Sequence, residues 1–146
     1  MKYLLISMLL LACKTENPNS IFKKNFNKYV EMFYPKQRFK QDCHQYILLP
    51  NQGCGFCISV TEKFINTDTI SNLSVLTNHS KNYNHPNVFF EDKTKESILS
   101  RINLKTGKGP AIIQFVNNEV VRIEVINADN YQNIFELIKT FEEGCK

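Results

Sequence analysis

The sequence predicts a mixed α/β domain in which a small sheet carries helices on both faces. From residue 46 onward the apolar patterns alternate as strand, helix, strand, short helix, hairpin and helix. The hairpin strands are joined by Asn117-Asn118, and asparagine tolerates the positive φ values that a two-residue turn needs. A strand–helix–strand unit implies parallel strands with a right-handed crossover, and the hairpin adds antiparallel strands. Helices on both faces of a small mixed sheet follow.

The composition is that of one globular domain. The chain has 146 residues, of which 42% are hydrophobic and 22% are charged. Its formal charge of +4 is mild, and the positive residues cluster in the N-terminal approach to the domain. This cluster comprises Lys23, Lys24, Lys28, Lys36, Arg38 and Lys40. We interpret it as a solvated helix face near a membrane anchor rather than a nucleic-acid interface, so no nucleic-acid partner is expected.

The N-terminus has the features of an export signal. Lys2 precedes the apolar run Leu4–Ala12, which is far shorter than the roughly 20 residues of a spanning helix. The run ends in Leu10-Leu11-Ala12-Cys13, which resembles the bacterial lipobox. This resemblance implies that residues 1–12 are a removed signal peptide and that Cys13 is acylated, which places the protein in the bacterial cell envelope, facing the periplasm or the exterior. An ordinary signal peptide followed by a chance cysteine is the alternative.

The next segment predicts a tether and an amphipathic helix. Residues 14–20 are polar, and residues 21–33 carry apolar side chains at helical spacing, at positions 22, 26, 29, 30 and 33. Such a helix packs on the domain or on the membrane surface, and Pro35 ends it. The predicted organisation is signal peptide 1–12, acylated tether and helix 13–40, and folded domain 41–146.

Within the domain, local patterns predict each element. The expected strands are 46–49, 71–77, 88–90, 111–116 and 120–126, and the expected helices are 54–65, 93–102 and a closing helix that ends at Gly144. A polar loop over 78–87 separates two of the strands. Asp129 and Gln132 have the spacing of a capping box for the closing helix. Its apolar stripe is assigned to the core: Tyr131, Ile134, Phe135, Ile138 and Phe141.

Cys54-Gly55-Phe56-Cys57 is the motif that carries chemistry. It closes a strand and opens a helix, where unpaired N–H groups and the helix dipole favour a thiolate. A thiolate attacks a disulfide to form a mixed disulfide, which a second thiol resolves. We therefore predict Cys54 as the nucleophile and Cys57 as the resolving thiol.

With this motif, the sequence resembles the thioredoxin family. Pro110, in Gly107-Lys108-Gly109-Pro110-Ala111, matches the position where that family has a cis-proline facing the cysteines. The resemblance implies a thioredoxin-like three-layer α/β/α fold over residues 41–146, with a redox-active disulfide that acts on protein thiols and disulfides. It also implies a substrate groove formed by Gly55, Phe56, Gly109 and Pro110. An ordinary trans Pro110 at a strand start is the alternative.

Two family positions differ here. Gly53 stands where a tryptophan is frequent, and Leu48 stands where the family has a buried acidic residue. Thiol activation would then rest on the helix terminus. The intervening pair contains no histidine, which would add positive charge beside the thiolate, so we expect a reducing to intermediate couple.

The predicted activity is that of a membrane-anchored thiol–disulfide oxidoreductase that needs no organic cofactor or metal. Its partners would be protein clients, an unidentified redox partner and the membrane, through the lipid on Cys13. The alternatives are a non-catalytic binding module with a structural Cys54–Cys57 disulfide, and a peroxidase-like enzyme, whose usual threonine and arginine partners are not apparent. A zinc site made by Cys43, His44, Cys54 and Cys57 matches no familiar ligand spacing.

The remaining cysteines are candidates for a structural bridge. In the predicted topology, Cys43 precedes the first strand and Cys145 ends the closing helix, both at the pole opposite the motif. They are expected either to form a disulfide or to remain free thiols. His79 and His85 lie in the polar loop and are interpreted as ordinary exposed residues.

Overall fold

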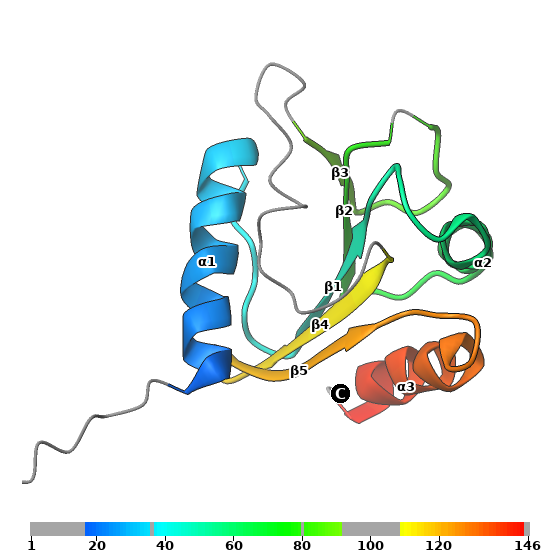
Figure 1. Cartoon of the computed structure of the whole chain (residues 1–146). Helices are drawn as coiled ribbons and strands as arrows, with labels where there is room; N and C mark the ends of the chain where they lie inside the picture. The colour runs from blue at the N-terminus through cyan, green and yellow to red at the C-terminus, as the bar shows by residue number, and fades with distance from the viewer. Residues whose placement is uncertain (1–16, 36, 80, 92–108, 145–146) are drawn as a thin grey trace, which may run out of the picture.

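One mixed sheet organises the protein, in a computed structural model that describes residues 17–35, 37–79, 81–91 and 109–144 (Figure 1). The strands are β1 (His44–Leu49), β2 (Leu73–Thr77), β3 (Val88–Phe90), β4 (Ala111–Val116) and β5 (Glu119–Val125). The helices of the described residues are α1 (Pro18–Phe33), α2 (Gly55–Thr67) and α3 (Tyr131–Gly144). The sheet order is β3-β2-β1-β4-β5, so the strand that leads to the cysteine motif lies at the centre.

The strand directions confirm the predicted mixed sheet. β1 is parallel to β2, with Gln45 opposite Leu73, and the chain between these strands contains α2. β1 is antiparallel to β4, with Leu48 opposite Ala111, and β4 and β5 form the antiparallel hairpin. The C-terminal end of β1 and the N-terminal end of β4 therefore lie side by side, at the same end of the sheet.

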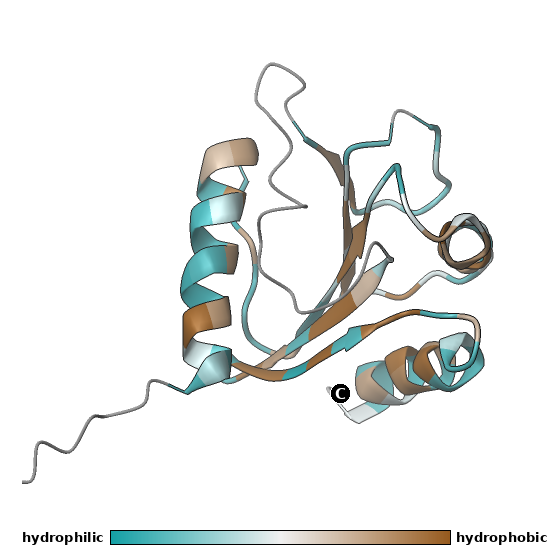
Figure 2. Ribbon diagram, viewed as in Figure 1, coloured by the Kyte–Doolittle hydropathy of each residue, from teal (hydrophilic) through white to brown (hydrophobic). Residues whose placement is uncertain are grey.

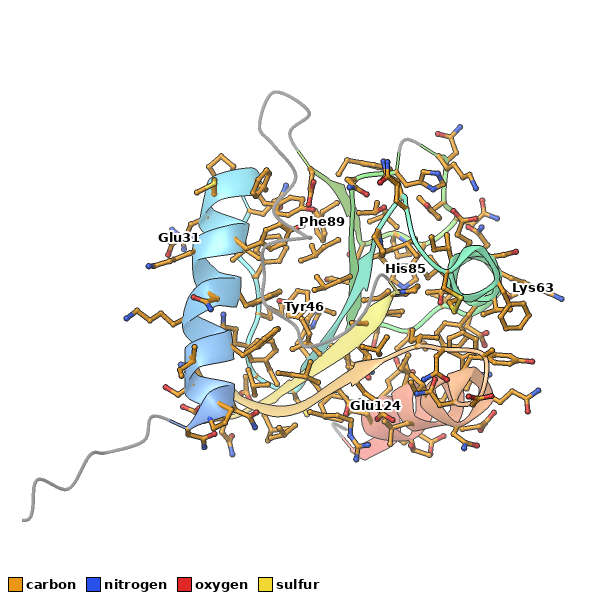
Figure 3. All side chains as sticks on the ribbon, viewed as in Figure 1. Glu31, Tyr46, Lys63, His85, Phe89 and Glu124 are labelled. Carbon is orange, nitrogen blue, oxygen red and sulfur yellow. A yellow bond between two sulfur atoms is a disulfide. The ribbon has the colours of Figure 1, made fainter. Side chains whose placement is uncertain are left out.

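Helices cover both faces, as predicted. α1 lies on one face and α2 and α3 lie on the other (Figure 1). The central strands are coloured mainly as apolar, whereas α1 and α3 alternate between apolar and polar residues (Figure 2). In the side-chain view, Tyr46 lies between the sheet and α1, whereas Glu31 on α1 and Lys63 on α2 point away from the sheet on opposite sides (Figure 3). The all-buried β1 thus separates two apolar cores.

Helix α1 is part of the first core. Its buried residues are those that the apolar spacing predicted: Phe22, Phe26, Tyr29, Val30 and Phe33. The ring of Phe26 lies 5.2 Å from that of Tyr46 and 5.5 Å from that of Phe115. Of the two predicted locations, the structure shows the helix packed on the domain.

Helix α1 begins three residues earlier than predicted. The side chain of Asn17 accepts a hydrogen bond from the N–H of Asn19, 3.0 Å away, and Pro18 occupies the first turn. Asparagine is a favoured N-cap, and proline suits the first helical position because its missing N–H would have no intrahelical partner. These two signals outweigh the lack of apolar residues before Ile21.

The start of α1 also contacts the edge strand β5. The Asn19 side-chain amide donates to the carbonyl of Val120 at 3.1 Å, and Lys23 pairs with Glu119 at 3.3 Å. This contact joins the first helix to the last strand of the sheet.

The predicted hairpin turn is confirmed at Asn117 and Asn118. Their φ values of 50° and 63° are both in the left-handed region, as a two-residue type I′ turn requires. The N–H of Asn118 donates to the carbonyl of Gln41 at 2.7 Å, and that of Asn117 donates to Asp42. The turn is therefore attached to the segment that enters β1.

The capping box predicted from Asp129 and Gln132 is wrong. The side-chain oxygen of Asn127 accepts from the N–H groups of Asp129 and Asn130, and the carbonyl of Asn130 accepts from Ile134 in the first turn of α3. Asn127 and Asn130 thus form the turn, since asparagine side chains readily bond nearby backbone groups. The Gln132 amide instead donates to the Tyr131 hydroxyl at 3.1 Å.

A buried hydrogen-bond network holds α3 on the sheet. Gln114 donates to the side-chain oxygen of Gln45 at 2.8 Å. Gln45 in turn donates to the carbonyl of Ile138 at 3.0 Å and to Asn72 at 3.2 Å. The exposed fractions of Gln45 and Gln114 are 0% and 2%, so these polar groups depend on one another.

Two predicted segments fall outside the described residues, namely the signal and lipobox region 1–16 and the helix expected over 93–102. Within the described part of the chain, no helix has the length and apolar character needed to cross a membrane.

Candidate active site

The cysteine motif follows directly from the central strand. After β1, the N–H of Asn51 donates to the side-chain oxygen of Asn78, 2.8 Å away, which attaches this loop to the end of β2. Gly53 then adopts φ 127°, a conformation that side-chain-bearing residues rarely adopt. Glycine at this position therefore lets the chain turn from β1 into α2.

Cys54 occupies the N-cap of α2, as the helix-start prediction requires. Its sulfur accepts a hydrogen bond from the N–H of Cys57 at 3.2 Å, and its carbonyl accepts from Ile58 at 3.0 Å. Unpaired N–H groups and the helix dipole at such a position stabilise negative charge on sulfur. The structure thus puts one motif sulfur where a thiolate would be favoured.

The two cysteines differ in accessibility. Cys54 is exposed, whereas 2% of Cys57 is exposed. They are joined as a disulfide, with their Cα atoms 5.2 Å apart. The Thr61 hydroxyl donates to the carbonyl of Cys57 at 2.7 Å within α2. Residue 54 is therefore exposed at the start of α2, whereas residue 57 is covered by protein.

The residue six positions before Cys54 is not acidic. Leu48 is 2% exposed and belongs to the α1-side core, across the sheet from α2. Farther along α2, Glu62 accepts hydrogen bonds from His79, Lys81 and Tyr83. Burial raises the pKa of Glu62, but these bonds outweigh that effect and lower it below its ordinary value. Glu62 is therefore a charged partner for the loop rather than a proton acceptor for the cysteines.

His79 has a role in packing that sequence analysis did not assign. Its Nδ1 lies 2.9 Å from Glu62, and its N–H donates to the Thr77 hydroxyl at 3.0 Å. It joins the end of β2 to α2, next to the Asn78 that holds the loop before the motif. The other loop histidine, His85, is buried, contrary to the prediction of an exposed residue, and its Nε2 lies 3.3 Å from the carbonyl of Ile70.

Phe56 forms an aromatic surface beside Cys54. It is 52% exposed, and its ring meets that of Tyr131 edge-on with centroids 5.5 Å apart. Tyr131 contacts Phe135, which stacks on Phe64 at 4.2 Å. Tyr131 packs against the core on this face of the sheet, as the predicted stripe of α3 implies, and its ring also contacts the motif residue Phe56. Tyr131 and Phe135 are four residues apart at the start of α3, and this spacing was the sequence signal for the contact between their rings.

The motif also leaves space for a partner. An added Cβ at Gly55 would meet no atom within 4 Å, so the backbone between Cys54 and Phe56 is open. At Gly109, by contrast, an added Cβ would lie 3.2 Å from the carbonyl oxygen of Ile126 and 3.3 Å from the side chain of Val125. A side chain at residue 109 would therefore require Ile126 or Val125 to shift by a few tenths of an ångström.

Pro110 lies at the motif end of the sheet, but its predicted cis bond is wrong. Ala111 pairs with Leu48, so Pro110 is beside the end of β1, and its carbonyl accepts from the N–H of Ile126 at 2.8 Å. The described residues contain no cis peptide bond, so the bond between Gly109 and Pro110 is trans. Trans is favoured for X–Pro bonds, and the hairpin hydrogen bond is made in this form.

The four-ligand zinc set is not brought together. Cys43 and His44 stand at the start of β1, and Cys54 and Cys57 follow its end, about 20 Å farther along a six-residue strand. The Nε2 atom of His44 lies 2.9 Å from the Ser74 hydroxyl. Among the described residues, no group of three or more potential ligands gathers to hold a metal ion.

The predicted bridge between Cys43 and Cys145 lies only partly within the described residues. Cys145 and the predicted lipidation site Cys13 lie outside the described residues. Close to Cys145 in the sequence, Glu142 of α3 accepts hydrogen bonds from the N–H and hydroxyl of Ser71 at 2.9 and 2.7 Å. The Asn72 amide donates to the carbonyl of Cys43 at 3.2 Å. The end of α3 thus lies at the same pole as Cys43, and a bridge to Cys145 stays a prediction.

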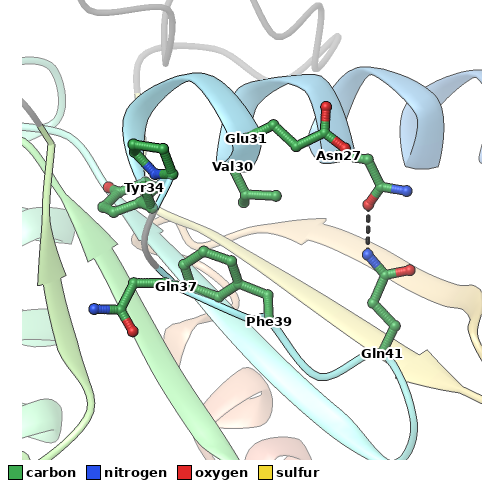
Figure 4. A pocket seen from close by; sticks show the side chains of 8 residues that line it. Asn27, Val30, Glu31, Tyr34, Gln37, Phe39 and Gln41 are labelled. Carbon is green, nitrogen blue, oxygen red and sulfur yellow. Dashed lines mark hydrogen bonds between the residues drawn. The ribbon is translucent and has the colours of Figure 1, made fainter.

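A shallow depression of about 330 Å³ lies on the other side of the sheet (Figure 4). It is lined by α1 and the chain that follows it, including Asn27, Val30, Glu31, Tyr34 and Gln37. No residue of α2 contributes to this depression, so it is separate from the cysteine motif.

Comparison with protein-family models, with curated protein sequences and with solved structures yields no match for this chain.

Proposed function

We propose that the protein is a thiol–disulfide oxidoreductase of thioredoxin-like fold, held at a bacterial membrane by a lipid on Cys13. The observation that carries this proposal is the placement of Cys54 and Cys57 across the first turn of α2. Cys54 is an exposed residue at the N-cap whose sulfur accepts an N–H hydrogen bond, and Cys57 is buried. This asymmetry suits an attacking thiolate followed by a protected resolving thiol.

The order and pairing of the strands support the proposal. A parallel β1–β2 unit with α2 between its strands, followed by an antiparallel hairpin and α3, is the arrangement that the family resemblance implies. Pro110 lies at the motif end of the sheet, although its peptide bond is trans. The proposed groove for the client chain is formed by Gly55, Phe56, Gly109 and Pro110.

The reaction begins from the reduced pair. The Cys54 thiolate attacks one sulfur of a client disulfide, which breaks that bond, and the other client sulfur leaves as a thiolate that takes up a proton. The Cys57 thiol then loses its proton and attacks the Cys54 sulfur. The second client thiol is released and the Cys54–Cys57 disulfide forms. Two electrons pass to the client, and a thiol donor must reduce the pair again.

Burial of Cys57 makes the second step the slower one in our proposal. Cys57 is 2% exposed and must lose a proton before its sulfur can attack. Burial in apolar surroundings raises a thiol pKa. We expect the mixed disulfide on Cys54 to accumulate during turnover, with a reducing to intermediate potential for the pair.

The direct test measures thiol reactivity after mild reduction. We expect one cysteine to alkylate rapidly at neutral pH, Cys54→Ser to abolish this phase, and Cys57→Ser to trap a mixed disulfide with a disulfide-bonded client such as insulin. If neither motif cysteine reacts faster than an unfolded-chain thiol, the chain is a binding module with a structural disulfide, and the enzymatic proposal is wrong.

A second test concerns the client surface. Phe56→Ala should slow the reduction of a protein disulfide about tenfold while leaving the reaction with a small disulfide unchanged, because it removes apolar contact and leaves the sulfurs. Phe90→Ala is the matched control, since Phe90 is 48% exposed and lies on β3. Equal effects of both variants would show that Phe56 is not part of the client surface.

A further inference from the structure

We propose that the outward face of α1 is a docking surface for a bilayer rich in anionic lipid, and that it holds the domain with α2 turned away from that bilayer. This surface consists of Ile21, Lys24 and Lys28, which are exposed on the side of α1 opposite its buried aromatics. It extends the proposed function by assigning the orientation of the domain on the membrane.

The charge of α1 fits an anionic partner. The helix carries three lysines and one glutamate, Glu31. Lys23 is engaged with Glu119, whereas Lys24 and Lys28 make no ion pair among the described residues and point into solvent. Basic side chains close to a membrane are attracted by the negative potential of anionic lipids.

The helix α3, on the other face of the sheet, has a net charge of the opposite sign. α3 carries three glutamates and one lysine, and that lysine, Lys139, pairs with Asp68 at 3.2 Å. Because the sheet separates α1 from α3 (Figure 1), these two helices place net charges of opposite sign on opposite faces of the described part of the chain. An anionic surface attracts the first and repels the second, so the charge distribution selects one orientation.

Docking on α1 is peripheral rather than inserted. The aromatic face of the helix, including Phe22 and Phe26, is buried against the sheet and is not available to lipid. Ile21 is 43% exposed and can contact the interface beside the lysines. The contact is therefore electrostatic and sensitive to salt.

The predicted lipid would bring this surface to the membrane. Three residues separate Cys13 from Asn17, the N-cap of α1, so the four Cα–Cα steps between them can span at most about 14 Å. A tether of this length makes docking an intramolecular event at high effective concentration. The docking surface itself belongs to α1 and does not depend on the thiol chemistry.

Docking through α1 determines which clients can reach the cysteines. α2, which begins at the motif, lies on the far face of the sheet from α1 (Figure 1). The exposed residue Cys54 would then face the aqueous side, and the clients would be water-soluble proteins rather than membrane-embedded segments.

The test uses the full chain reconstituted into vesicles of phosphatidylcholine, with or without phosphatidylglycerol, that contain a nitroxide-labelled lipid as quencher. A fluorescent amino acid is incorporated at Asn25 on α1 or, as the matched position, at Asn133 on α3, since both are exposed helical asparagines. We expect quenching at Asn25 in anionic vesicles, its loss when ionic strength rises from about 0.1 M to about 1 M, and little quenching at Asn133.

Charge reversal distinguishes lipid docking from simple tethering. Lys24→Glu and Lys28→Glu should each lower the ratio of docked to undocked protein at least about fivefold. Lys63→Glu on α2 makes the same charge change on the opposite face and should have no effect. Equal quenching at Asn25 and Asn133, or quenching at Asn25 that is independent of phosphatidylglycerol, would overturn the proposal. Alkylation of Cys54 in the same samples reports on the thiol chemistry separately.

Discussion

Replacing Phe26 with alanine should destabilise the whole domain, although Phe26 belongs to a helix that precedes the predicted domain start at residue 41. The side chain is fully buried and its ring meets those of Tyr46 and Phe115 at 5.2 and 5.5 Å. Phe→Ala in a core costs about 3–5 kcal/mol, because apolar burial is lost and a cavity remains. With the ring contacts to Phe22, Tyr46 and Phe115 lost, we expect about 4 kcal/mol.

This loss would be a large part of the total stability, since domains of this size are stable by about 5–15 kcal/mol. The measurement is urea unfolding of the oxidised protein followed by circular dichroism, with midpoints compared at a constant slope. Asn25→Ala, on the exposed side of the same helix, is the control and should change the free energy of unfolding by less than about 0.5 kcal/mol.

The reasoning fails if Phe26→Ala and Asn25→Ala unfold at the same urea concentration, because α1 would then not belong to the cooperative unit. A double-mutant cycle with Phe115→Ala gives a second check. Contacting rings should show a coupling free energy of about 0.5–1.5 kcal/mol, whereas independent sites would be additive.

Three further predictions concern polar groups and cysteines. Gln114→Leu should cost about 1–3 kcal/mol in urea unfolding because it leaves the buried oxygen of Gln45 without its donor, and Gln45→Leu in the same chain should restore part of the loss. No recovery in the double variant would contradict this account. Burial, with a smaller effect of Lys40, lowers the pKa of His44 to about 4. The unfolded state therefore binds more protons between about pH 6.5 and 4, and stability should fall by up to about 3 kcal/mol as the pH drops through this window. Burial also lowers the pKa of His85, so His44→Gln should reduce the dependence of the unfolding free energy on pH without removing it. An unchanged dependence would refute the assignment of this effect to His44. Cys43→Ser should lower the melting temperature to the same value as Cys145→Ser while leaving alkylation of the motif unchanged, and unequal losses would contradict the predicted bridge.

The sequence predicted the parts of the fold that depend on local pattern. The apolar spacing of 21–33 identified each buried residue of α1, and Asn117-Asn118 identified the turn, because each signal is read over a few neighbouring residues. The parallel and antiparallel pairings followed from the order of elements. The edge strand β3 pairs with β2 through three residues, and the pattern of these residues alone did not predict the strand with which they pair.

The parts that were missed depend on contacts between distant segments. Tyr131 was assigned to the core because its spacing fits the stripe of α3, but only the folded chain brings its ring against Phe56. The bonds of Glu62 to His79 and Tyr83 join α2 to a loop about 20 residues later. Asparagine side chains readily bond nearby backbone groups, so Asn127 and Asn130 form the turn before α3 in place of the capping box expected from Asp129.

The contact between Asn19 and the carbonyl of Val120 has a consequence for association between molecules. Edge strands offer unpaired carbonyl and N–H groups on which another chain can add as an extra strand. On β5, the first turn of α1 takes one of these carbonyls and places the Lys23–Glu119 ion pair beside it. A neighbouring molecule would have to displace that turn before it could add a strand there. Loss of the Asn19 amide would therefore first be seen as aggregation during refolding, rather than as a change in the midpoint of unfolding.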